Sequence, residues 1–204
     1  YFRHRITSEN IEEALVKILN DIKGSFAFVI LTPHKLIGVR DPLGIKPLCI
    51  GMLDSAHILA SESCALDAIG AKYTRQVNPG EIIVIDENGM RSIQTGTTGK
   101  SRFCIFEFVY FARHDSFING VSVYEARLEA GRRLAMEHPV DADLVIGVPD
   151  SGLIAALGFS RQSGIPYGTG LIKNRYVGRT FIKPGQGKRE IAVKIKFNAI
   201  RSEI

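Results

Sequence analysis

Two segments of the sequence carry residues that could bind an anion. The first is Val148-Pro-Asp-Ser-Gly152, which follows the apolar run Leu144–Val148 and precedes Leu153–Phe159, a segment with helical spacing. This order predicts a strand, a tight turn and a helix N-terminus, where free backbone N–H groups and the helix dipole favour a negatively charged ligand. Ser151 can cap the helix, and Gly152 lets a ligand approach the backbone closely. Taken alone, the pattern favours an ordinary strand-to-helix turn with a serine cap.

The second segment is a basic arm, residues 173–186, with the sequence Lys-Asn-Arg-Tyr-Val-Gly-Arg-Thr-Phe-Ile-Lys-Pro-Gly-Gln. Its glycines and proline predict a mobile loop, and cations on such a loop, facing a helix N-terminus, suit a polyphosphate. The turn would hold one phosphate while the arm folds over the others. A solvated basic loop is one alternative. Nucleic-acid binding by stacking on Tyr176 and Phe181 is another, but no nucleic-acid-binding module surrounds them.

Composition and charge narrow the class of protein. The chain has 204 residues, of which 45% are hydrophobic and 23% charged, so it can bury one or two cores. Its net charge is +5, but residues 171–204 hold nine Lys or Arg and two Glu and carry +7, which leaves −2 for the rest. The basic character therefore indicates a local anionic ligand. Three widely spaced cysteines fit a reducing cytosol, and no apolar run is long enough to span a membrane.

In the first half, the pattern predicts an antiparallel sheet layered with helix. Ser8, followed by acidic residues and an apolar face, predicts a capped amphipathic helix. Ser25–Leu31 is typical of a strand buried on both faces, and Arg40–Leu48, with two prolines, of a rigid loop. Further strands are expected at Lys35–Arg40, His57–Glu62 and Glu81–Asp86. A short helix is expected at Ser63–Ile69.

The second half follows a polar, glycine-rich linker at residues 96–103 and alternates strand with helix, which predicts a parallel sheet. Cys104–Phe111 is an apolar segment rich in aromatic residues. A helix is expected from Val123 to about Glu137, with its three arginines (Arg127, Arg132 and Arg133) on a solvated face. Strands are expected at residues 144–148 and 166–172.

Several longer motifs together resemble the glutamine phosphoribosylpyrophosphate amidotransferases, which catalyse the first committed step of purine synthesis. The resemblance covers essentially the whole chain. In the second half it rests on Cys104–Ser116, Val148–Gly152 and Gly170–Ile182, and in the first half on Arg40–Leu48, Ala60–Leu66 and Asn78–Glu81. The match at Lys173–Ile182 is the most specific. The Arg-Asp-Pro-x-Gly motif is weaker, because related glutamine amidotransferases share it.

The resemblance implies a two-domain fold. Residues 1–95 would form the C-terminal half of an N-terminal-nucleophile (Ntn) hydrolase glutaminase, an αββα sandwich, and residues 104–204 a truncated type I phosphoribosyltransferase α/β domain. The first domain would release ammonia from glutamine. The second, a pentosyltransferase, would pass it to C1 of phosphoribosyl pyrophosphate and displace pyrophosphate. Alternatives are a degenerate regulatory nucleotide-binding paralogue and a salvage-type phosphoribosyltransferase.

The resemblance also implies roles for individual residues. The substrate-binding set comprises Asp150, Ser151, Gly152, Lys173, Arg175, Tyr176 and Arg179, with Ser151 at the Mg²⁺-linked position. The walls of an ammonia channel would be Phe106, Tyr110, Phe181 and Ile182. A dry aromatic conduit keeps ammonia neutral and excludes water, but the sequence of Phe106 and Tyr110 alone favours a place in the core. Cys104 matches an iron–sulfur ligand of one family branch, with a buried free thiol as the alternative.

The chain departs from the family pattern at its ends. It begins with Tyr1, whereas the family's catalytic Cys is the first residue of the mature enzyme, and it ends before the ribose-phosphate loop. We therefore expect a central fragment without catalytic residues, inactive alone. His114 stands where the family usually has Pro. The implied partners are glutamine, phosphoribosyl pyrophosphate and inhibitory purine nucleotides, in a cytoplasmic homo-oligomer (dimer or tetramer), without nucleic acid or membrane.

Overall fold

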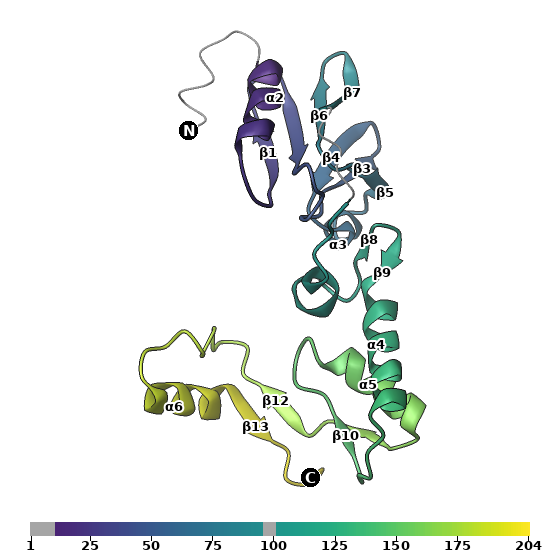
Figure 1. Ribbon diagram of the computed structural model, residues 1–204, viewed down its shortest axis with the longest axis vertical. Coiled ribbons are helices and arrows are strands. Elements are labelled where there is room, and N and C mark those ends of the chain that lie inside the picture. The colour runs from purple at the N-terminus through teal and green to yellow at the C-terminus, as the bar shows by residue number, and fades with distance from the viewer. Residues whose placement is uncertain (1–10, 96–100) are drawn as a thin grey trace. The chain divides into compact units, whose positions relative to one another are not determined.

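The computed structural model describes residues 11–95 and 101–204, which group into two compact units (Figure 1). The first unit contains the described residues up to Glu107 together with Phe111–Ser122. The second contains Phe108–Tyr110 and Val123–Ile204. The domain ranges 1–95 and 104–204 stay a prediction, and within the described chain the segment after the linker groups with the first unit. Ser8, the predicted helix cap, lies outside the described residues.

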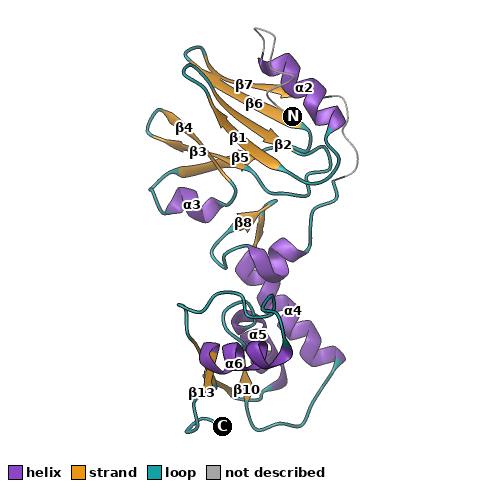
Figure 2. Ribbon diagram, turned by 90° about the vertical axis from the view of Figure 1, so that its left-hand side faces the viewer, coloured by secondary structure: helices purple, strands orange, loops and turns teal. Residues whose placement is uncertain are grey.

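The first unit contains two antiparallel sheets and two helices packed on them (Figure 2). One sheet has the order β1-β2-β6-β7 and the other β4-β3-β5. The strands of the first sheet are β1 (Ala27–Leu31), β2 (Leu36–Arg40), β6 (Glu81–Asp86) and β7 (Gly89–Gln94). Those of the second are β3 (Cys49–Leu53), β4 (Ala56–Ala60) and β5 (Lys72–Gln76). The helices are α2 (Ile11–Asp21) and α3 (Ser63–Asp67), and the hairpin β8 (Phe117–Ile118) and β9 (Val121–Ser122) completes the unit.

Alternating side chains of β2 and β6 build the layers of this unit. On one face, Ile37, Val39, Ile82 and Val84 are buried against Leu15 and Leu19 of α2. On the other face, Ile83 packs with Leu48 and Ile50 of the second sheet, and α3 covers the far side of that sheet through Leu66. Because side chains alternate along a strand, the result is a helix–sheet–sheet–helix stack. The predicted antiparallel sheet with helical layers is confirmed.

Strands β2 and β6 are largely buried on both faces, whereas β1 is not. The prediction that Ser25–Leu31 is buried on both faces was therefore wrong. Val29 is 51% exposed and Leu31 80% exposed. The apolar sequence of β1 suggested a central strand, but β1 lies at the edge of its sheet and pairs with β2 alone within the described chain. Composition does not distinguish an edge strand from a central one.

The loop between β2 and β3 is rigid, as its two prolines predict. Buried Asp41 accepts the backbone N–H groups of Leu43, Ile45 and Lys46 at 3.0–3.1 Å. The guanidinium of Arg40, 2% exposed, donates to the backbone carbonyls of Gly44, Lys46 and Val77 at 2.5–2.9 Å. A buried cation and a buried anion thus satisfy the backbone of one turn.

Glu81, at the start of β6, is a buried carboxylate, 1% exposed, with several donors around it. Arg75 pairs with both carboxylate oxygens at 2.7 and 2.8 Å, and Ser92 and the Asn78 backbone N–H donate at 2.6 Å. Burial raises the pKa of Glu81, but the hydrogen bonds from Arg75, Ser92 and Asn78 outweigh it, so the pKa lies below its ordinary value. A carboxyl group with a depressed folded-state pKa stabilises the fold above its unfolded pKa.

We therefore expect acid to destabilise the protein partly through Glu81. Its contribution is complete above about pH 5 and is lost as the pH falls through the folded-state pKa. Glu81→Gln should lower the free energy of unfolding at pH 7 and flatten its decline between pH 5 and pH 3, measured by urea denaturation. Glu87→Gln, at an exposed turn position, is the matched control. An unchanged acid slope in Glu81→Gln would contradict this assignment.

The second unit contains parallel and antiparallel strand pairs with three helices. Its elements are α4 (Val123–Glu137), β10 (Val145–Ile146), α5 (Leu153–Ser163), β11 (Tyr167–Gly168), β12 (Leu171–Lys173), α6 (Gln186–Lys196) and β13 (Phe197–Ala199). β10 and β11 pair in parallel, as predicted, whereas β12 and β13 are antiparallel. The π-helix η1 (Glu107–Phe111) joins residues of both units. No helix in the described chain is long and apolar enough to cross a membrane.

Helices α4 and α5 pack closely through two glycines. A Cβ atom on Gly131 would lie 1.8 Å from the carbonyl oxygen of Ala155, and one on Gly158 would lie 2.0 Å from that of Leu128. Arg127 does not lie on a solvated face as predicted: it is 4% exposed, and its Nε donates to the Phe108 carbonyl at 2.5 Å. Arg132 and Arg133 do face solvent, and both pair with Glu129.

Candidate functional site

The turn at residues 147–152 connects β10 to α5 and is shaped by two glycines. A Cβ on Gly152 would come within 2.9 Å of the Val148 carbonyl oxygen, and one on Gly147 within 2.7 Å of the Leu153 Cα. The Gly152 N–H donates to the Val148 carbonyl at 3.1 Å. The predicted serine cap is wrong, because the N-cap residue is Gly152 and no side chain caps the helix. The Ser151 hydroxyl is therefore not used to hold α5.

The basic arm reaches the turn through its first residue. Lys173, the last residue of β12, pairs with Asp150 of the turn at a distance of 2.6 Å between Nζ and Oδ2. This places one cation of the arm beside the predicted phosphate turn. Their side chains are 25% and 50% exposed, so an incoming anion can reach the ammonium group. The fold thus brings these two segments together at this one pair.

The next residues of the arm form hydrogen bonds with the end of α6 and with each other. The Asn174 N–H donates to the Lys196 carbonyl at 2.7 Å, and the Asn174 side chain accepts the Tyr176 N–H at 3.0 Å. Arg175 and Arg179 are exposed, and Tyr176 is fully exposed. The arm therefore presents its cations and its aromatic ring to solvent, and they are free to rearrange around a ligand.

The four residues predicted to line an apolar conduit are all exposed. Phe106, Tyr110, Phe181 and Ile182 have exposed fractions of 57%, 56%, 69% and 67%. The alternative interpretation, that Phe106 and Tyr110 are ordinary core residues, is therefore wrong.

Cys104 is partly exposed and its thiol is free. Cys49 and Cys64 are buried around α3, where burial raises the pKa of Cys49 to about 11, with smaller contributions from Cys64 and Glu62. No three His, Cys, Asp or Glu side chains gather as a metal site within residues 11–95 and 101–204. The described residues thus supply Cys104 as a single cysteine, not a ligand set.

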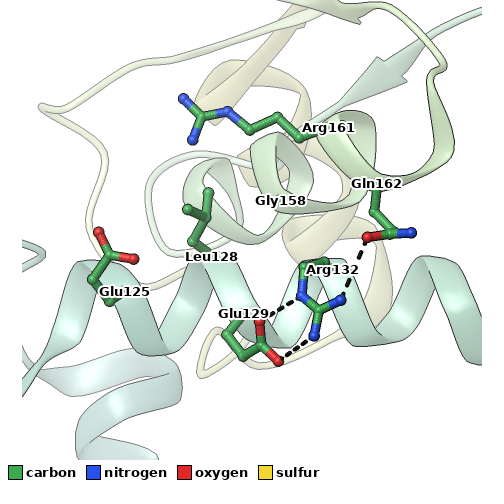
Figure 3. A pocket seen from close by; sticks show the side chains of 7 residues that line it. All are labelled: Glu125, Leu128, Glu129, Arg132, Gly158, Arg161 and Gln162. Atoms are coloured by element: carbon green, nitrogen blue, oxygen red, sulfur yellow. Dashed lines mark hydrogen bonds and ion pairs between the residues drawn. The ribbon is translucent and has the colours of Figure 1, made fainter.

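A separate cavity of about 160 Å³ lies between α4 and α5 (Figure 3). Arg132 is one of its lining residues, pairing with Glu129 at 2.6 Å and approaching the Gln162 side-chain oxygen at 3.5 Å. Arg161 lies on the opposite helix. Three of the polar side chains that line this cavity, those of Glu129, Arg132 and Gln162, are thus engaged with one another.

Sequence reasoning missed one polar contact near the aromatic segment. Glu107 is 5% exposed and pairs with Lys46 at 2.9 Å. A single carboxylate within the apolar run Cys104–Phe111 was the available signal, because a buried charge requires a partner. Nothing in the sequence identifies that partner, which lies 61 positions away.

Comparison with known proteins finds one matching domain model and several similar proteins. Residues 3–68 match the model of a glutamine amidotransferase domain. An amidophosphoribosyltransferase of Archaeoglobus fulgidus is 47% identical, over 98% of this chain and 44% of the relative. An amidophosphoribosyltransferase of Synechocystis is 51% identical, over 93% of this chain and 39% of the relative. Over nearly its whole length the chain is similar to amidophosphoribosyltransferases. The predicted resemblance is confirmed.

Two solved structures show the same similarity. The glutamine phosphoribosylpyrophosphate amidotransferase of Bacillus subtilis, complexed with ADP and GMP, is 45% identical, with a TM-score of 0.88 over 98% of this chain and 45% of its own. A structure described as the allosteric regulatory enzyme of purine biosynthesis is 44% identical, with a TM-score of 0.87. The match covers 100% of this chain and 44% of the chain in that structure. The chain spans less than half the length of the amidophosphoribosyltransferases it matches.

Proposed function

We propose that the protein is a glutamine-dependent amidophosphoribosyltransferase, which converts phosphoribosyl pyrophosphate into 5-phosphoribosylamine at the start of purine synthesis. The similarity to that family along nearly the whole chain carries the proposal. The pair of Lys173 with Asp150 supports it, because it joins the phosphate turn to the basic arm.

The domain assignment forms part of the proposal. The helix–sheet–sheet–helix stack of the first unit is the layering of an Ntn glutaminase, and residues 3–68 match a glutamine amidotransferase domain. The parallel pair β10–β11, followed by the turn and α5, suits a type I phosphoribosyltransferase. We assign glutamine hydrolysis to the first and transfer of ammonia to the second.

The turn and the arm would bind phosphoribosyl pyrophosphate by charge. Lys173, Arg175 and Arg179 can pair with phosphate oxygens, Gly152 allows close approach to the backbone, and Tyr176 can cover the ligand. As the bond between C1 and pyrophosphate breaks, negative charge grows on the leaving group, and these cations stabilise it. The arm must close over the substrate, which its exposed position permits.

Mg²⁺ fits the donors at this turn. The Ser151 hydroxyl and the Asp150 carboxylate are hard oxygen donors, and Mg²⁺ is commonly held by few protein oxygens together with substrate phosphates. When bound, it neutralises charge on the pyrophosphate. An iron–sulfur cluster does not fit the described residues, because Cys104 stands without three further thiolates. No step is assigned to such a cluster.

The exposed apolar side chains would form the path of ammonia between the two reactions. Phe106, Tyr110, Phe181 and Ile182 carry no charged groups, and a path lined by them would keep water out and ammonia unprotonated. Purine nucleotides are proposed as inhibitors, since the Bacillus subtilis relative binds ADP and GMP. Assembly into homo-oligomers and a cytoplasmic location remain predictions.

The test uses the full-length natural protein with phosphoribosyl pyrophosphate and Mg²⁺. Glutamine or ammonium should each support pyrophosphate release, and glutamine should yield glutamate in step with it. A salvage-type phosphoribosyltransferase would release pyrophosphate with a purine base instead. A regulatory paralogue would bind nucleotides without releasing pyrophosphate. Either result would reject the proposal.

Lys173→Met should weaken the use of phosphoribosyl pyrophosphate. A hydrogen bond to a charged group contributes about 1.5–3 kcal/mol, so kcat/KM for this substrate should fall roughly 10- to 100-fold. The control is Lys188→Met, which removes an exposed charge from α6. Steady-state kinetics with ammonium as nitrogen donor measure both variants. Equal kinetics for the two would show that Lys173 does not contact the substrate.

A further inference from the structure

The segment that enters η1 is bound to the rigid loop of the first unit. We call residues 41–46 the dock and residues 102–107 the strap. Two backbone hydrogen bonds join them, from Arg102 N–H to the Leu43 carbonyl at 2.8 Å and from Cys104 N–H to the Ile45 carbonyl at 3.4 Å. The ion pair of Lys46 with Glu107 is the third contact.

Lys46 contacts both ends of η1. Its Nζ lies 2.9 Å from Glu107 Oε1 and 4.9 Å from the centre of the Phe111 ring. Glu107 begins the π-helix, and its backbone carbonyl accepts the Ala112 N–H at 3.0 Å. One ammonium group therefore holds the first and last residues of η1 together.

The two side chains of this ion pair are buried to different extents, so that losing Lys46 would leave a buried carboxylate. The Glu107 side chain is 6% exposed, whereas that of Lys46 is 38% exposed. If the ammonium group were removed, a carboxylate would remain buried without this counter-charge, which is costly. The carboxylate would then turn toward water and carry the start of η1 with it. Single-turn π-helices are short and often lie at functional sites, so such a shift would be local.

The dock itself cannot follow this movement. Asp41 and Arg40 satisfy its backbone from within, and both are buried. Lys46 thus extends from a fixed support to an aromatic segment whose side chains are exposed. Phe106 directly precedes Glu107, and the centroid of its ring lies 6.4 Å from the centroid of the Phe111 ring.

We propose that Lys46 is a positioning residue, which through Glu107 and Phe111 sets the place of the aromatic side chains of η1 and keeps glutamine hydrolysis coupled to ammonia transfer. This inference rests on the proposed function, in which Phe106 and Tyr110 line the ammonia path. Lys46 belongs to the loop matched to the glutaminase half, so the support of the path would lie in the domain that produces the ammonia.

The experiment compares Lys46→Met with Lys35→Met in the full-length natural protein. Lys35 pairs with Glu12 at 2.6 Å and is 32% exposed, so it loses a similar ion pair in the same unit. Amide hydrogen exchange at Ala112 reports whether η1 is held. The amounts of glutamate and pyrophosphate formed from glutamine report coupling.

For Lys46→Met, we expect amide exchange at Ala112 to be about tenfold faster, because losing a charged partner shifts the local opening equilibrium of η1 by about a factor of ten. We also expect the amount of glutamate formed to exceed that of pyrophosphate about twofold or more. Lys35→Met should change neither. Glu107→Gln should change the exchange rate and the product ratio as Lys46→Met does. Lys46→Arg should keep both close to those of the unaltered protein. A merely structural role would speed exchange without changing the ratio of products.

Two results would overturn the proposal. Equal exchange in the two methionine variants would show that Lys46 does not hold η1, and faster exchange with an unchanged product ratio would show that η1 does not govern coupling. If the unaltered protein formed no pyrophosphate from glutamine, the proposed function would fail, and coupling with it, while exchange would still report whether Lys46 holds η1.

Discussion

Asp41→Ala is expected to lower the free energy of unfolding by about 3–5 kcal/mol. The carboxylate is fully buried and accepts three backbone N–H groups. Its removal leaves those donors without an acceptor in the turn and leaves the buried Arg40 guanidinium without an adjacent counter-charge. The loop that supports the strap would lose its shape, and the β2–β3 connection would loosen.

Urea denaturation followed by circular dichroism measures this loss. Asp67→Ala, which removes an exposed carboxylate from α3, should change stability by no more than about 0.5 kcal/mol. If both variants unfolded at the same urea concentration, the loop would not depend on Asp41. Asp41→Asn should lie between them, because an amide oxygen can accept some of the three hydrogen bonds.

Gly131→Ala is expected to destabilise the second unit by about 3 kcal/mol or more. The new methyl carbon would lie 1.8 Å from the Ala155 carbonyl oxygen, which belongs to the backbone of α5 and cannot rotate away. The two helices would have to separate, and Gly158 would lose its own close contact with the Leu128 carbonyl. The gain in helix propensity from alanine is far smaller than this cost.

Gly187→Ala provides the control. This residue lies in the first turn of α6, where an added Cβ would meet no atom within 4 Å. Alanine there should be neutral or stabilising by up to about 1 kcal/mol. Thermal unfolding of the two variants against the unaltered protein separates the effect of crowding from that of helix propensity. A stable Gly131→Ala protein would mean that the α4–α5 contact is not so close.

Local patterns in the sequence predicted the long elements well. The α4 helix, the β6 strand and the rigid turn at Arg40–Leu48 all follow from periodicity, capping and proline placement. The strands β3, β5 and β7 were missed although they are as long as the strands that were predicted, and β5 and β7 have a weak apolar pattern. The prediction also omitted α6, since Gly185 and Gly187 lie beside its start and indicate a loop. Tertiary packing, not propensity, decides such segments.

The candidate site was predictable only where its parts are local. The turn at residues 148–152 and the cations of the arm are visible in the sequence, and β10 and β12 bring Lys173 to Asp150. The burial of Arg127 and the pairing of Lys46 with Glu107 were not predictable, because each depends on which distant backbone or carboxylate the fold brings near. Single-sequence patterns carry no information on such pairings.

The exposed edge of β1 has a consequence for the behaviour of the protein in solution. Ala-Phe-Val-Ile-Leu has no charge, proline or bulge, and its outer backbone groups have no strand beside them within the described chain. Natural sheets usually protect such a border with a lysine or a proline. A border of five neutral, β-prone residues is the kind of edge to which a further strand can be added by backbone hydrogen bonds, from another part of the same protein or from another molecule.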